Sequence, residues 1–329
     1  MLARARRKWP YLIIAAPLVF LVLIPFDWFL GQYTSIMIFI GINTMVTVGL
    51  CLLMGYTGQI SLGQAAFYGM GAYISAILSK TYHVNPWLAM LIGAAATGAF
   101  AYAIAYPVFR LRGYYLAMAT LGLGVIVYIL FRELDQYTGG PDGMAGIPCL
   151  SIGGLVFDTP FKRYFLVWFF CLAILLLSQN IVKSRTGRAL RAIHGNEAAA
   201  ESIAINVTQF KVKIFVLSAV YASLAGSLLV HHLRFVSPQP FGFLASVMVA
   251  VMAVMGGLAS IWGAIFGTAA IRILSDEVLA KPELVGWDVV VYGAILMIVM
   301  IFLPQGLFVG LKELYERWRL RYAERGAEP

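Results

Sequence analysis

The sequence predicts an all-α fold, a polytopic membrane helix bundle of about ten segments in which glycine breaks some of the helices. The 329 residues are 61% hydrophobic and only 12% charged, whereas a soluble domain is nearer half apolar and a quarter charged. A water-soluble core of this size cannot bury so much apolar side chain, so lipid must act as the solvent. Backbone amides in hydrocarbon must be satisfied internally, which makes the apolar stretches helices. The alternation of a β-barrel strand is absent.

Ten apolar stretches come near the length that crosses a bilayer. They lie at residues 11–30, 33–54, 61–79, 87–107, 113–132, 163–182, 211–232, 243–256, 261–280 and 287–304. With the basic N-terminus in the cytoplasm, most Lys and Arg residues fall in cytoplasmic loops, as the positive-inside rule requires. Both termini are then cytoplasmic. The basic start is followed at once by further apolar segments, so we expect an uncleaved first helix rather than a removed signal peptide.

The chain divides into a membrane domain and a short tail. Residues 1–310 are the expected transmembrane domain, which includes a cytoplasmic inner loop at 183–210, and residues 311–329 form a charged cytoplasmic tail. The tail mixes Leu, Tyr and Trp with Lys and Arg, which suits an amphipathic helix at the lipid headgroups; a solvated tail that only fixes orientation is the alternative. An outer loop at 133–162 contains the turn-rich run Thr138–Gly143 (TGGPDG), where no helix is expected.

The polar stretch Gly55–Gln64 (GYTGQISLGQ) is the first candidate site. Its glycines favour irregular backbone, which survives at membrane depth only where protein covers it or where it lines a watery cavity. Uncharged hydrogen-bonding groups here would line a translocation path. The path candidates are Thr57, Gly58, Gln59, Ser61 and Gln64. Close helix packing through small residues, with Ser and Thr bonding across helices, explains the stretch equally well.

The inner loop is the second candidate site. Thr186 is expected to cap a short helix that runs through Ile193 and ends at Gly195, and Asn196 is expected to cap a second helix. Two short helices joined at a corner, with a smooth run of alanines, form a rigid surface on which another protein can dock. The candidate docking residues are Gly187, Arg188, Arg191, Gly195, Asn196, Glu197, Ala200 and Glu201. A plain connector held at the headgroups by arginines is the alternative, but it needs neither this length nor two caps.

The other ionisable or reactive side chains are expected to have structural roles. Arg272 and Asp276, with Glu277 beside them, are candidates for an ion-coupling site, but an i,i+4 ion pair near the outer helix end is favoured. His231 and His232 are expected at the membrane interface, because no third metal ligand is evident. The cysteines lack CxxC spacing and are expected to act as small buried hydrophobic residues; they are Cys51, Cys149 and Cys171.

Several classes of function are disfavoured. The formal net charge of +9 comes from basic residues beside the ends of apolar segments, which is a pattern of membrane topology rather than of nucleic-acid binding. No convergent set of His, Asp or Cys indicates an enzyme, and there is no GxxxxGK[ST] phosphate loop. The apolar segments hold no string of carboxylates for protons or sodium. Energy for uphill transport would therefore be supplied by another protein, and the inner loop is the expected site at which that protein docks.

A faint internal echo links the two halves of the chain. Met54-Gly55 precedes Ser61-Leu62-Gly63, and Met255-Gly256 precedes Ser260-Ile261-Trp262-Gly263. Paired broken segments are typical of transporters built from repeats, although glycine is common in membrane helices.

Four motifs resemble a known family. They are Gly55–Phe67 (GYTGQISLGQAAF), Thr138–Pro148 (TGGPDGMAGIP), Gly187–Ile193 (GRALRAI) with Asn196-Glu197, and Met255–Gly257 (MGG) with Trp262–Ala264 (WGA). In this order, over about residues 37–304, they resemble the LivM-type permease of branched-chain amino-acid ABC importers. His194-Gly195 departs from the pattern, because relatives often carry a charged residue before the Asn-Glu pair.

The resemblance implies a non-enzymatic permease of the bacterial inner membrane with the ABC importer fold. Its expected partners are a LivH-type sister permease, two cytoplasmic ABC ATPase subunits, a periplasmic binding protein and membrane lipid. The chain itself needs no cofactor, since the ATPases bind ATP. Leucine, isoleucine or valine would enter the cytoplasm by alternating access, with the inner loop as the coupling helix. Import of urea or short amides is an alternative on the same architecture, and a self-sufficient secondary transporter or channel is another.

Overall fold

The computed structural model describes residues 33–111, 113–152 and 155–279, with a few positions between 290 and 297. The described chain is mostly helical, which confirms the predicted helix bundle. The apolar segment predicted at 11–30, most of that at 287–304 and the tail at 311–329 lie outside the described residues.

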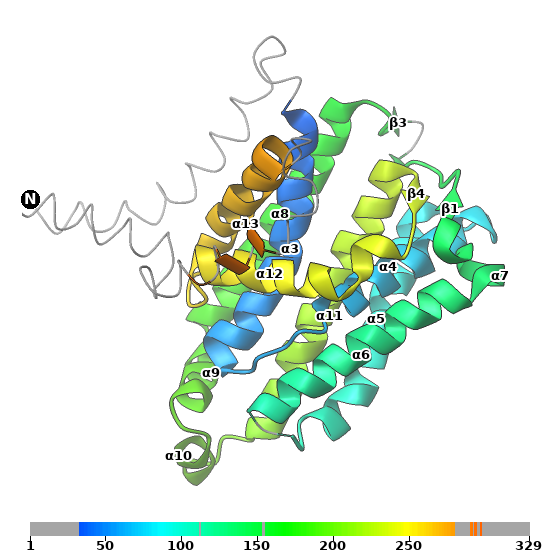
Figure 1. Ribbon diagram of the computed structural model, residues 1–329. Coiled ribbons are helices and arrows are strands. Elements are labelled where there is room, and N and C mark those ends of the chain that lie inside the picture. The colour runs from blue at the N-terminus through cyan, green and yellow to red at the C-terminus, as the bar shows by residue number, and fades with distance from the viewer. Residues whose placement is uncertain are drawn as a thin grey trace, which may run out of the picture.

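Long helices dominate the bundle (Figure 1). Five of those described are long and apolar enough to cross a membrane: α3 (Thr34–Thr57), α5 (Pro86–Val108), α6 (Tyr114–Glu133), α8 (Pro160–Lys183) and α11 (Val207–Leu233). Shorter apolar helices accompany them: α4 (Gln64–Lys80), α12 (Phe243–Gly256) and α13 (Gly263–Ile273), which continues as a π-helical turn, η3 (Leu274–Leu279). The chain is therefore a multi-pass membrane protein.

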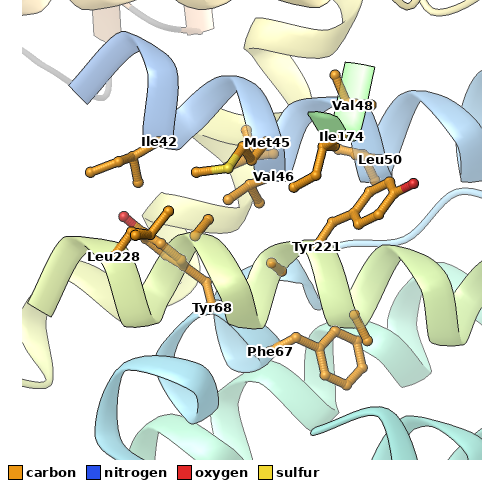
Figure 2. Close-up of a cluster of buried hydrophobic side chains, with 14 of the residues drawn as sticks. Ile42, Met45, Val46, Val48, Leu50, Phe67, Tyr68, Ile174, Tyr221 and Leu228 are labelled. Atoms are coloured by element: carbon orange, nitrogen blue, oxygen red, sulfur yellow. The ribbon is translucent and has the colours of Figure 1, made fainter. Parts of the chain in front are cut away.

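Helices α3 and α11 form the centre of the bundle. Both are largely buried, and α11 packs along α3, α4 and α5. Figure 2 shows Met45 and Val46 of α3 facing Leu228 of α11, with Tyr68 of α4 beside them. A Cβ on Gly226 would lie only 1.9 Å from the carbonyl oxygen of Tyr68, so α11 approaches α4 backbone to backbone. Such close approach through small residues is how membrane helices pack.

The outward faces of the long helices remain apolar. Leu91 of α5, Ile126 of α6 and Phe169 of α8 are all more than half exposed, at 59%, 58% and 67%. Exposed apolar surface on this scale marks contact with a membrane or with another protein.

The two ends of the bundle carry different structures (Figure 1). At one end lie the short helices of the inner loop, α9 (Arg185–Gly195) and α10 (Glu197–Ser202). At the other, β1 (Met144–Ala145) pairs antiparallel with β4 (Phe235–Val236), and β2 (Ser151–Ile152) forms a hairpin with β3 (Leu155–Val156).

The expectation that no helix occupies the turn-rich run of the outer loop is wrong in part. Helix α7 (Asp135–Thr138) extends into it, and η1 (Gly140–Asp142) is a 3-10 turn; η2 (Gln239–Phe241) lies between β4 and α12. Glycines with positive φ limit these helices to single turns, since Gly139 and Gly143 have φ of 75° and 74°. Composition predicted the turns, but not that two of them would close helical hydrogen bonds.

Candidate functional site

The inner loop folds into two short helices, as predicted. The side chain of Asn196 accepts from the backbone N–H of Ala199 and caps α10, which begins at Glu197. The predicted cap at Thr186 is wrong: Ser184 caps α9 and accepts from the backbone N–H of Thr186 at 3.1 Å. Both residue types suit the position, and the chain enters α9 two residues earlier because α8 ends at Lys183.

The candidate docking residues do not share one face. Arg188, Arg191, Gly195, Asn196 and Glu201 are exposed, whereas Gly187 and Ala200 are buried. Ala200 is only 2% exposed and packs with Ile193 and Val207. Ala200 therefore lies on the side of α10 that faces α11 and not on its exposed side, and its role in docking stays a prediction. Ala198 and Ala199 are the exposed alanines of α10.

Glu197 is paired within the chain. Its carboxylate accepts from the Lys211 ammonium at 2.6 Å. Arg191 donates to the backbone oxygen of Val182 at 3.2 Å, which holds α9 against the end of α8.

The first candidate site lies where α3 ends and α4 begins. Gly58 has φ of 69°, a left-handed conformation that suits glycine. The backbone N–H of Gln59 bonds the carbonyl oxygen of Leu53 at 3.1 Å, and the Thr57 hydroxyl donates to that same oxygen at 2.6 Å. After this turn the chain runs without helical structure to Gln64, the first residue of α4.

The polar path candidates are buried, and several of their atoms have no protein partner. Thr57, Gln59, Ser61 and Gln64 are each at most 3% exposed. Among the described residues, neither amide atom of Gln59 nor the hydroxyl of Ser61 has a hydrogen-bond partner. Gln64 donates to the Ser218 hydroxyl at 2.9 Å, and its amide oxygen has no partner. Unpaired buried polar atoms call for an explanation such as a bound water or ligand.

Three further residues fix this polar stretch. The hydroxyls of Thr120 on α6 and Ser246 on α12 accept from the backbone N–H groups of Leu62 and Ala65, at 3.0 and 3.1 Å. Ser218 on α11 is the third. The sequence analysis missed them, and their only signal is a hydroxyl residue within an apolar segment.

The tertiary structure brings the two candidate sites together. A Cβ built on Gly58 lies 3.0 Å from the Nδ1 atom of His194, near the end of α9. The inner loop therefore rests directly against the turn that ends α3. His194 was noticed in the sequence only as a departure from a motif.

The two glycine-interrupted stretches also meet. A Cβ on Gly55 would lie 1.8 Å from the carbonyl oxygen of Leu258, and the Tyr56 hydroxyl donates to the carbonyl oxygen of Ala259 at 2.6 Å. The turn between α12 and α13 thus packs on the last turn of α3, beside the first candidate site.

Arg272 and His231, two other titratable residues named in the sequence analysis, have partners within the chain. Arg272 pairs with Asp276 at 3.3 Å, as expected, and its guanidinium lies 4.4 Å from the ring centre of Phe39. His231, in the last turn of α11, is 2% exposed, and its ring nitrogens bond the Ser75 hydroxyl and the carbonyl oxygen of Pro148, each at 2.8 Å. It is buried because the outer loop folds back over the end of α11.

Neither metal nor disulfide chemistry is indicated within the described residues. No group of three His, Cys, Asp or Glu side chains there is placed to hold a metal ion. Cys51 and Cys171 are buried as expected, whereas Cys149 is partly exposed and accepts from the Arg234 guanidinium at 2.8 Å.

The bundle is that of a multi-pass membrane protein, and comparisons with known proteins identify its family. The family described as "Branched-chain amino acid transport system / permease component" matches residues 32–300. This chain therefore belongs to that family of permease components.

The relatives are named as permeases, not as enzymes. The LivM permease protein of the high-affinity branched-chain amino acid transport system of Salmonella typhimurium is 31% identical over 289 residues, which cover 81% of this chain and 67% of LivM. Its Escherichia coli counterpart matches equally well. The LivH permease protein of E. coli is 26% identical and covers 80% of this chain and 90% of LivH. The chain is thus LivM-like, with weaker similarity to LivH.

Proposed function

We propose that this chain is the permease subunit of an ATP-driven importer that moves branched-chain amino acids into the cytoplasm by alternating access. The contact between His194 and Gly58 carries this proposal. It links the inner loop, which offers a docking surface, to the non-helical break between α3 and α4, which offers a path. A displacement of α9 must be felt at the end of α3, because no space separates them.

The chemistry of the break suits an uncharged path. The substrate would be a zwitterion with an aliphatic side chain, and it needs hydrogen bonds without a fixed counter-charge in the chain. The unpaired amide of Gln59, the Ser61 hydroxyl and the amide oxygen of Gln64 supply such groups. Thr57 and Gly58 shape the turn that presents them.

The proposed assembly has separate parts for power, selection and passage. Two cytoplasmic ABC ATPase subunits bind ATP and dock on the exposed residues of α9 and α10. A LivH-type sister permease completes the membrane part, and a periplasmic binding protein delivers leucine, isoleucine or valine. In this arrangement the chain lies in the bacterial inner membrane with both termini in the cytoplasm.

Alternating access requires that the ATPases contact the two states of the permease differently. Closure of the ATPases around ATP would push the inner loop. Since α9 rests on the end of α3, the push reaches the break between α3 and α4. The break then changes which side of the membrane it faces.

Reconstitution tests the proposal directly. The chain is placed in liposomes alone, with its sister permease, and with the sister permease, the ATPases and the binding protein. Uptake of labelled leucine, isoleucine, valine, urea and acetamide is then followed with and without ATP. We expect that only the full complex takes up the amino acids, and only when ATP is present.

Three outcomes contradict the proposal. Accumulation of solute by the chain alone, driven by an ion gradient, indicates a secondary transporter. Equilibration of the solute across the membrane with neither ATP nor an ion gradient indicates a channel. ATP-driven uptake of urea or acetamide with no uptake of amino acids keeps the motor but replaces the substrate class.

A further inference from the structure

A partly buried ion pair joins the second helix of the inner loop to α11, one of the two central helices of the bundle. Glu197 is the first residue of α10, and Lys211 lies in the second turn of α11. Their charged atoms are 2.6 Å apart, and only 9% of the Lys211 side chain is exposed. An ammonium withdrawn this far from water needs its counter-charge. Among the described residues, no other ion pair connects the inner loop to a long helix.

Other contacts make α10 and α11 a single rigid corner. Ala204 has φ of 59°, an uncommon conformation for a residue with a side chain. The turn is closed by two backbone bonds, from Ala204 to Glu201 at 3.0 Å and from Ile205 to Ala200 at 3.2 Å. Apolar packing of Ala200 against Val207 adds a third constraint. Helix α10 therefore cannot swing freely about α11.

The first helix of the inner loop is attached elsewhere. Ser184 caps α9 directly after α8, and Arg191 bonds the Val182 carbonyl oxygen at the end of α8. Between α9 and α10 stands Asn196, whose backbone is extended at φ −161° and ψ 117°. A force on α9 therefore reaches α8 and, through Ile193, also Ala200 of α10 and Val207 of α11. A force on α10 passes to α11, to which the Glu197–Lys211 pair ties it.

We infer that the Glu197–Lys211 pair is a positioning link through which α10 turns α11, an inference that rests on the proposed function. Helix α11 carries Ser218, whose hydroxyl holds the Gln64 amide at the start of α4. A rotation of α11 therefore moves a group of the candidate path. Glu197 acts in this way through Lys211, not by contact with the ATPases or the solute. Separation of the pair would leave Lys211 buried and unpaired, so the two helices move together.

Charge reversal in the full complex tests the link. Glu197→Gln and Lys211→Met each break the pair, and the double variant Glu197→Lys with Lys211→Glu restores it with opposite polarity. Lys213→Met on α11 is the matched control, since its side chain is exposed and belongs to neither candidate site. The measurements are co-purification of the ATPases, ATP hydrolysis, and solute moved per ATP.

A transmission role predicts that the single variants assemble and hydrolyse ATP but move about tenfold less solute per ATP. The reversed pair recovers most of that loss, and the Lys213→Met control behaves as the wild type. A purely structural role would lower assembly and leave the ratio unchanged. Wild-type coupling in either single variant overturns the inference, and so does a reversed pair as impaired as the singles.

The proposed function can fail separately. If the wild-type complex moves no branched-chain amino acid, the substrate class is wrong. The link is then judged by the stimulation of ATP hydrolysis that the permease confers on the ATPases. Stimulation that is identical in the wild type and both single variants overturns the link by itself.

Discussion

Gly58→Leu tests whether the contact between α9 and the end of α3 serves transport. With φ at 69°, any side chain at this position costs about 1–2 kcal/mol. A Cβ there lies 3.0 Å from Nδ1 and 3.6 Å from Cε1 of His194, so the rest of a leucine must displace the imidazole or the end of α3. If the backbone strain and the displacement together cost about 2 kcal/mol in only one of the two alternating-access states, the equilibrium between these states shifts about 30-fold.

The assay is uptake of labelled leucine by the reconstituted full complex, with co-purification of the ATPases measured in parallel. We expect an assembled complex with uptake lowered at least about tenfold. Gly122→Leu on α6 is the matched control, because no atom lies within 4 Å of a Cβ there. Gly58→Leu combined with His194→Ala should recover the steric part of the loss and keep the conformational part.

Wild-type uptake in Gly58→Leu refutes the reasoning, because the turn would then tolerate both the strain and the displaced histidine. Loss of assembly in Gly58→Leu, with Gly122→Leu intact, refutes it in another way. The contact would then hold the fold together without transmitting a movement.

The remaining predictions concern four other positions. Ala199→Arg, on the exposed side of α10, should abolish co-purification of the ATPases at unchanged thermal stability. Ala200→Arg, at a buried position, should instead lower the free energy of unfolding by about 1–3 kcal/mol. Equal co-purification of the ATPases with both variants would count against docking on α10. Gln64→Leu should lower uptake at normal assembly, and unchanged uptake would remove this amide from the path. His231→Ala should lower the melting temperature, since it leaves buried polar partners unsatisfied at about 1–3 kcal/mol.

Local signals predicted the secondary structure of the inner loop well. A residue that caps a helix acts on N–H groups two or three positions away, so Asn196 could be recognised without knowledge of the rest of the fold. The same signal misplaced the first cap by two residues, because Ser184 and Thr186 are both suitable and only the end of α8 distinguishes them.

Long-range contacts decided which side chains are available to a partner. Ala200 belongs to a favourable docking pattern in the sequence, yet α10 folds it against Val207. Glu197 resembles an exposed helix-start carboxylate until Lys211, fourteen residues later, is placed beside it. Neither outcome has a signal in the neighbouring residues, because each depends on the angle between two helices.

The sequence by itself determined that this chain is a membrane protein and that its apolar segments form helices. It also determined at which positions polar residues interrupt those segments. Hydrocarbon enforces that result, since an unpaired backbone amide has no water to bond. Only the tertiary structure decided that His194 rests on Gly58 and that Gly55 meets Leu258. These contacts join segments far apart in the chain, and they depend on close backbone approach, which hydropathy and spacing do not encode.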